Sequence, residues 1–304
     1  NWSALERVNC PDLADYNLFA DDEDPRSTPH ERGVPYVLNS KLFSDHAVKY
    51  RVIFVPPGKQ MTYQDKNSHG INATVLSPPG TVIAKTFAHP NEPDNAEKVI
   101  ETRLLIKRIN GKGNAFWRGL PYVWETDDNG KAVAKLAMGG MTTASSWHFH
   151  DSDSGVLQVG QTDRYMVPDA NTCINCHGND DRPAGAAPIG PKVRHLNRPY
   201  KPETAFMNGE GQAAFPASNQ LQYWVDKGLL RGAPELNVDP DTQLARNVEH
   251  VPRWNVPGDS GHAADSDKDI EARIRGYLEV NCQHCHNPHG TAKNTGFYLD
   301  VFRK

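Results

Sequence analysis

Before residue 167, apolar and polar positions alternate in short runs rich in Val, Ile, Tyr and Thr. Such alternation is typical of strands that bury one face, and turn sequences such as SPPG, NGKGN and TDDNGK separate the runs. Short strands at regular spacing predict an antiparallel sandwich or half-barrel. The expected strands cover residues 47–55, 81–89, 98–109, 122–125 and 131–138.

After residue 167 the apolar period changes to that of a helix in two segments. Residues 219–230 place apolar side chains on one face, with Asn219 as the expected N-cap. A second helix is expected to begin near Ser266 or Asp267 and to run into a cysteine-containing segment. Its apolar positions are Ile270, Ile274, Tyr277 and Leu278.

These patterns predict an α+β fold with two domains. Residues 1–166 are expected to form an antiparallel β-sandwich-like domain, and residues 167–304 a mainly helical, loop-rich lobe. A chain of 304 residues is long enough for two domains. Apolar residues make up only 38% of it, and 23 Pro and 24 Gly indicate many loops and a modest core.

Charge and hydropathy exclude several classes of partner. The formal net charge of −4 is mild and indicates neither nucleic acid nor an anionic membrane surface. No apolar run approaches the length that crosses a bilayer, so we expect no membrane span. The chain opens on Asn1-Trp2-Ser3 without a signal peptide, and we interpret it as the mature form of an exported protein.

Four of the five cysteines lie in two C-x-x-C-H motifs, at residues 173–177 and 282–286. This motif is typical of c-type haem, in which two thiols bond to the macrocycle and the adjacent His ligates the iron. The fifth cysteine, Cys10, is interpreted as a buried or free thiol, with an intermolecular disulfide as the alternative. The predicted haem-binding residues are Cys173, Cys176, His177, Cys282, Cys285 and His286, with His177 and His286 as proximal iron ligands.

The alternative interpretation is a single zinc site built from both cysteine pairs. Cys176 and Cys282 are separated by 105 residues, far more than in a zinc ribbon. Zinc binding also gives no reason for a His to follow both pairs. The sequence therefore favours two covalently bound c-type haems (haem c), and residues 167–304 are expected to form a diheme cytochrome c lobe with the first motif at the domain junction.

Several long runs resemble a family of bacterial diheme c-type cytochromes that carry an N-terminal β-domain and are mostly of unassigned role. The runs include VPYVLNSKLFSDHAVKYR, ETRLLIKR, PIGPKVRHLN, NQLQYW and YLEVNCQHCHNPHG, and the resemblance covers nearly the whole chain. It implies two covalent haems and, because such haems are attached outside the cytoplasmic membrane, a periplasmic or extracellular protein. Members of the family continue past TGFYLD with a segment that includes Met-Pro, whereas this sequence ends at VFRK.

A second similarity covers the stretch from PPGTVIAKTF through LLIKR to CINCH. This stretch is similar to the β-sheet c-haem proteins of the cytochrome c′-beta and hydroxylamine-oxidising group, in which a sheet covers one haem face. Lys85 and Lys107 are the two lysines that could match the crosslinking lysine of that group, and a solvent-facing position is the alternative for both.

The distal ligands of the two irons are not given by the motifs, and no Met follows His286. His148 and His150 in WHFH point the same way in an extended segment, so one of them can ligate iron or both can hold a metal. The alternative for this pair is a polar edge strand. His195, in the basic run KVRHLNR, is the next candidate, and Met207 is a candidate thioether ligand whose alternative is ordinary packing.

Electron transfer to redox partner proteins is the favoured function, because no nucleotide loop, nucleophile elbow or zinc-protease motif is present. The runner-up is a haem enzyme with one open-coordination haem acting on peroxide, hydroxylamine or a nitrogen oxide. A third interpretation is a polymerising subunit, in which a His from a neighbouring chain ligates the second iron and links chains into an oligomer or filament.

Overall fold

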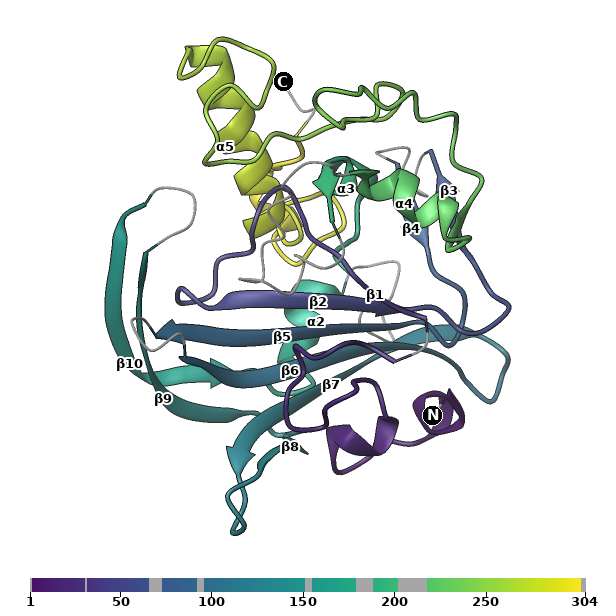
Figure 1. Cartoon of the computed structure of the whole chain (residues 1–304), viewed down its shortest axis with the longest axis vertical. Helices are drawn as coiled ribbons and strands as arrows, with labels where there is room; N and C mark the ends of the chain where they lie inside the picture. Colours follow the sequence, from purple (N-terminus) through teal and green to yellow (C-terminus); the bar gives the residue numbers. More distant parts are fainter. Residues whose placement is uncertain are drawn as a thin grey trace.

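The computed structural model of the chain describes residues 2–30, 32–65, 73–91, 96–150, 155–178, 188–201 and 218–301. Its centre is a large, mostly antiparallel sheet with the strand order β1-β2-β5-β6-β7-β8, which runs through the middle of Figure 1. The strands are β1 (Gly33–Pro35), β2 (Val48–Phe54), β5 (Val82–Asn91), β6 (Ala96–Ile109), β7 (Ala115–Thr126) and β8 (Ala132–Leu136).

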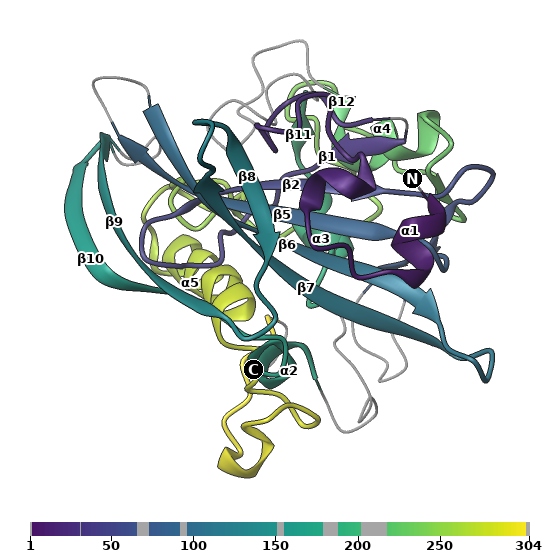
Figure 2. The ribbon, with the colours of Figure 1, turned by 90° about the horizontal axis from the view of Figure 1, so that it is seen from below.

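Two further strands, β9 (Met141–His150) and β10 (Leu157–Val167), form a hairpin that curves away from the sheet as a projecting arm (Figures 1 and 2). The arm joins the sheet at one parallel bridge, between His148 and Asn91 of β5. The remaining described strands form two small sheets. One contains β3 (Met61–Gln64), β4 (Thr74–Leu76) and β13 (Leu230–Arg231), and the other β11 (Pro199–Tyr200) and β12 (Ser218–Asn219).

Alternation along the strands gives the sheet two apolar faces, as expected for a period of two. One face, which includes Val52, Phe54 and Leu104, packs against the N-terminal segment with α1 (Trp2–Arg7) and the short 3-10 helix η1 (Leu13–Tyr16). Figure 2 shows this segment lying over the sheet. Cys10 is buried and free in this layer, which confirms the expected thiol.

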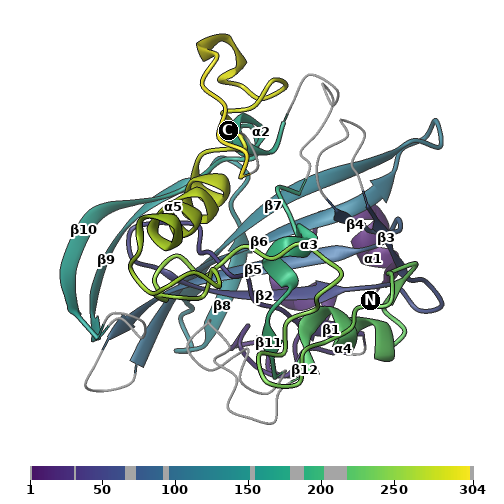
Figure 3. The ribbon, with the colours of Figure 1, turned by 90° about the horizontal axis from the view of Figure 1, so that it is seen from above.

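The opposite face carries the C-terminal part of the chain (Figure 3). Its apolar core joins Ile53 and Ile83 of the sheet to Leu196 and Trp224. The helices on this side are α2 (Thr172–His177), α3 (Val193–Leu196), α4 (Gln220–Asp226) and α5 (Asp267–Asn281). One core therefore contains residues from both sides of the expected domain boundary at residue 166.

The expected fold class is wrong, because the protein is mostly β. Strands hold 35% of the residues and helices 17%. A single large sheet, covered by helices and loops, replaces the expected sandwich. Between residues 188 and 301 the described chain contains no helical cytochrome lobe, since its helices are short and separated by long irregular segments. Proline and glycine explain why these helices are short. Proline cannot continue a helix, and Gly228, with a φ of 63°, stops α4 after seven residues.

The expected individual elements are largely confirmed. Each of the five predicted strand segments lies in or overlaps a strand from β2 to β8. The Asn219 side chain accepts hydrogen bonds from the first turn of α4, and Ser266 caps α5. One expectation about α5 fails, since Ile270 and Ile274 are 39% and 51% exposed while Asp269, Gly276 and Glu279 are buried.

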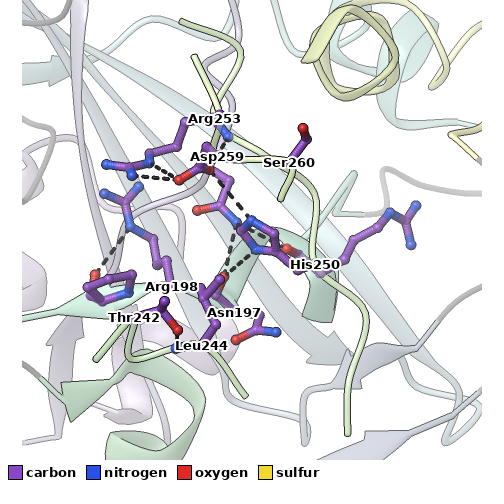
Figure 4. A network of polar contacts seen from close by, with 12 residues as sticks. Asn197, Arg198, Thr242, Leu244, His250, Arg253, Asp259 and Ser260 are labelled. Carbon is purple, nitrogen blue, oxygen red and sulfur yellow. Dashed lines mark hydrogen bonds and ion pairs between the residues drawn. The ribbon is translucent and has the colours of Figure 1, made fainter. Parts of the chain in front are cut away.

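A network of side chains holds the irregular segment before α5 (Figure 4). Asp259 accepts hydrogen bonds from the backbone N–H of Arg253 at 2.7 Å and from its guanidinium at 2.6 Å. His250 lies 3.5 Å from the same carboxylate and 3.0 Å from the carbonyl of Asn197. Burial acts to raise the pKa of Asp259, but the contacts with His250 and Arg253 outweigh it and hold the pKa well below its usual range.

Asp259→Asn is expected to lower the free energy of unfolding by about 1.5–3 kcal/mol at pH 7, because Asn cannot replace the charged hydrogen bonds to Arg253. The folded pKa is depressed, so this stabilisation is present above the unfolded pKa of about 3.9 and is lost as the pH falls below it. In urea unfolding, the difference in free energy of unfolding between the wild-type protein and Asp259→Asn should therefore shrink by about 1 kcal/mol between pH 7 and pH 3. A difference independent of pH would contradict this role of the carboxylate.

Candidate functional site

A cavity of about 370 Å³ lies between the second face of the sheet and the segments that cover it. Its floor is the sheet, with Ile83, Lys85, Arg103 and Leu105 among the residues that line it. Its wall includes residues of α2 and its roof includes residues of α3 and α5. The volume is within the range of about 300–1,000 Å³ that is usual for ligand and cofactor sites.

The first C-x-x-C-H motif forms the short helix α2 at this wall. Asp169 begins the helix by accepting hydrogen bonds from the backbone N–H of Asn171 and Thr172 and from the Thr172 hydroxyl, at 2.6–2.8 Å. Cys173, Cys176 and His177 all line the cavity. Burial raises the pKa of both thiols, so they are protonated when unmodified.

The second motif follows α5 directly, as the sequence predicts. The backbone N–H groups of Cys285 and His286 donate to the carbonyl of Cys282 at 3.1 and 2.9 Å, which folds the motif into a tight turn. The Nδ1 atom of His286 lies 3.1 Å from the carbonyl oxygen of Phe297. A proton on Nδ1 satisfies this contact and leaves Nε2 as the nitrogen that can bind a metal.

The two motifs, separated by 104 residues in the sequence, meet in the fold. The sulfur atoms of Cys176 and Cys285 and a ring nitrogen of His284 lie within 4.8 Å of one another. The carbonyl of Asn175 accepts a hydrogen bond from the Thr291 hydroxyl at 3.1 Å and lies 3.7 Å from the Cys285 sulfur. The chain thus brings one cysteine of each motif to the same place.

The cluster of Cys176, His284 and Cys285 is also the one group of three potential metal ligands found within the described residues. It does not match the expected zinc alternative, in which both cysteine pairs would surround one ion. A structural zinc site needs four ligands, and this cluster takes one cysteine from each pair.

A buried ion cluster forms part of the roof. Glu279 of α5 is fully buried and accepts hydrogen bonds from Lys192 at 2.9 Å and from Arg194. Its second oxygen lies 2.9 Å from Nε2 of His195, whose side chain is nearly fully buried. Burial, with the charges of Arg194 and Lys192, lowers the pKa of His195 well below its usual range, so the ring is neutral and donates its Nε2 proton to Glu279.

Two histidines of the cavity carry buried ring nitrogens without a hydrogen-bond partner in the described part of the chain. They are Nδ1 of His195 and Nδ1 of His284. Burial lowers the pKa of His284 as well, which favours a neutral ring. A neutral imidazole nitrogen that is buried and unpaired is an available metal ligand.

These features fit a haem at the first motif. A macrocycle bonded to Cys173 and Cys176 would enter a cavity with apolar side chains on its floor, cations beside them and an unpaired imidazole nitrogen in its roof. Burial of a large apolar group in such a cavity is favourable. At the second motif, the exposed ring of Phe297 packs edge-on to His286 with ring centroids 5.7 Å apart.

The other predicted ligands fall outside this site. His148 and His150 lie on the β9–β10 arm, and neither is among the residues that line the cavity. Met207 lies outside the described residues. Lys107 donates a hydrogen bond to the carbonyl of Ser77, while Lys85 lines the cavity. The sequence analysis did not single out Glu279 or His284, and the partners of Glu279 lie more than 80 residues away in the chain, where no local pattern marks them.

Comparison with known protein families, with curated proteins and with solved structures finds no significant match to this chain. The resemblance to diheme cytochromes therefore rests on the sequence runs quoted above.

Proposed function

We propose that this protein is a diheme c-type cytochrome that transfers electrons to and from redox partner proteins. The observation that carries the proposal is the meeting of two C-x-x-C-H motifs beside one cavity, with sulfur atoms of the two motifs within 4.8 Å of each other. A c-type haem supplies reversible one-electron chemistry at its iron. Two such groups anchored from adjacent thiols would lie close together, as in a short electron relay.

In this proposal His177 and His286 would be the proximal ligands, and the chain orients the ring of His286. The Phe297 carbonyl at 3.1 Å from Nδ1 of His286 selects the tautomer whose Nε2 can ligate. Hydrogen bonds of this kind also make the ligating nitrogen more basic, which is one of the means by which a protein sets a reduction potential.

His195 is the distal ligand that the geometry favours for the first iron. Its Nε2–H donates to the buried carboxylate of Glu279, and this leaves a neutral Nδ1 in the cavity roof. A ligating His whose other nitrogen donates to a carboxylate is a recurrent arrangement at protein metal sites. His284 provides the second imidazole in the same cavity.

Electron paramagnetic resonance and absorption spectra of the purified holoprotein test this function. Electron transfer predicts two low-spin, six-coordinate haems in the wild-type protein. In His195→Ala one of them is expected to become high-spin, and added imidazole should restore the low-spin signal. His150→Ala, on the projecting arm, serves as the control and should leave both signals unchanged.

Two other outcomes would change the assignment. A high-spin haem in the wild-type protein that binds cyanide would favour the haem enzyme acting on peroxide, hydroxylamine or a nitrogen oxide. A loss of low-spin signal in His150→Ala, together with assembly of the wild-type chain into oligomers, would favour a ligand donated between subunits. A monomer with two six-coordinate haems excludes such donation.

The proposal places the protein in the periplasm or outside the cell, where covalent haem attachment takes place. Among the described residues, no helix is both long and apolar enough to cross a membrane.

A further inference from the structure

Three cations lie side by side on the floor of the cavity. Arg51 of β2 is directly opposite Lys85 of β5, and Lys85 is directly opposite Arg103 of β6. All three line the cavity. Residues opposite each other on one face of a sheet have Cβ atoms about 4.5–5.5 Å apart, and like charges in such positions repel each other. A row of three cations is therefore destabilising unless an anion lies beside it.

Arg103, at one end of this row, has an anionic partner, and the Arg51 guanidinium donates a hydrogen bond to the Lys49 carbonyl at 3.3 Å. Glu101 is buried and accepts hydrogen bonds from Arg103, with Nε at 2.7 Å. Lys85, in contrast, has no acidic side chain within ion-pair distance in the described ranges, and its ammonium lies 4.9 Å from the ring centroid of Phe87. Burial and the charges of Arg103 and Arg51 lower the pKa of Lys85 well below its usual range. Glu279, the one carboxylate among the described residues that line the cavity, is already paired in the roof.

The position of the first motif indicates which anion this row receives. Cys173 lies beside Gly119 of β7, with its sulfur 3.8 Å from where a Cβ of Gly119 would be. From β7 the strand order runs through β6 and β5 to β2, so Arg51 is three strands away. At about 4.8 Å per strand this is roughly 14 Å. The thioether bonds of a c-type haem are on one edge of the macrocycle and its two carboxylates are on the opposite side.

We propose that Arg51 and Lys85 bind the carboxylates of the haem attached at Cys173 and Cys176, so that the macrocycle spans the strands from β7 to β2. The inference rests on the proposed function, since it requires a haem at the first motif. An arginine fork and an ammonium are the usual partners of carboxylates, and their charges stabilise the reduced haem, which carries one more negative charge. A soluble oxoanion has the same chemistry and is the competing source of the negative charge.

The test uses holoprotein in which the charge is removed by Arg51→Gln or Lys85→Gln. Arg51→Lys and Lys85→Arg keep the charge, and Lys107→Gln is the control. Lys107 lies on the same face of β6 but is not among the residues that line the cavity. The equilibrium constant for reduction of the first haem should fall about tenfold in each cavity Gln variant, equivalent to about 59 mV. The control should stay within about twofold of wild type. The propionate bending band in the resonance Raman spectrum should shift in the same two Gln variants and return in the charge-preserving ones.

Three results would overturn the inference. Titration with nitrite or phosphate should leave the wild-type spectrum unchanged, and a saturable change that the Gln variants abolish would overturn the inference in favour of a soluble anion. Unchanged potentials and Raman bands in both Gln variants, with two haems still bound, would overturn the inference and leave the proposed function standing. Absence of a haem from the first motif in the wild-type protein would overturn both.

Discussion

Replacing Glu279 with alanine is expected to lower the free energy of unfolding by about 3–5 kcal/mol, because it leaves buried cations without their carboxylate. Glu279 joins Lys192 and Arg194, and thereby α5 to the segment around α3. Glu279 and Arg194 are both fully buried, so water cannot replace the carboxylate that Arg194 loses. Typical total stabilities are about 5–15 kcal/mol, and the variant should therefore unfold at a much lower urea concentration.

Glu271→Ala provides the control on the same helix. Glu271 pairs with Arg275 one turn later at 2.8 Å, but its side chain is 62% exposed and that of Arg275 is 37% exposed. Exposed pairs contribute little, and this variant should unfold close to wild type. Equal urea midpoints for the two variants would show that the Glu279 cluster does not hold the roof of the cavity in place.

The double variant Cys173→Ala/Cys176→Ala is expected to carry one covalent haem instead of two. The remaining haem should be attached at Cys282 and Cys285, and any haem still held in the cavity should be extractable into acidified organic solvent. Alanine keeps the wall of the cavity apolar, so the change removes the covalent bonds with little change in packing. Absorption spectra before and after extraction, with mass spectrometry of the intact chain, measure this directly.

Cys10→Ala is the matched control, because Cys10 is a buried free thiol in the layer on the other face of the sheet. It should retain both haems. Retention of two covalent haems in the double variant would show that the first motif is not an attachment site, and the proposed function would then be wrong.

Local structure followed from the sequence more reliably than the arrangement of elements. The alternation in 47–55 and 98–109 gave β2 and β6, and Asn219 and Ser266 cap the helices they were expected to cap. A period of two shows that a strand has two faces, but it does not show what covers each of them. For that reason the alternation predicts a sandwich, whereas the structure has a single large sheet covered by loops and short helices.

The same limit applies to α5. Its apolar residues Ile270 and Ile274 were expected to face a helical lobe, but the helix buries Glu279 instead. A buried glutamate is stable only with partners, and these partners come from a segment more than 80 residues earlier in the chain. No local pattern marks such a pairing.

The candidate site was only partly predictable for the same reason. The C-x-x-C-H motifs mark the residues proposed to attach haem, because their spacing is local. The other residues that line the cavity come from strands and helices that are distant in sequence, as with Arg51 and Glu279. The WHFH run was the more conspicuous pair of histidines, but the fold places it on the projecting arm.

The number of covalently bound haems per chain tests the central claim most directly. Pyridine haemochrome absorbance on a known amount of purified holoprotein, with mass spectrometry of its proteolytic peptides, gives both the number and the positions. The account predicts two haems per chain, one on the peptide with Cys173 and Cys176 and one on the peptide with Cys282 and Cys285. Unmodified cysteines in both peptides, with zinc bound in place of haem, would contradict it.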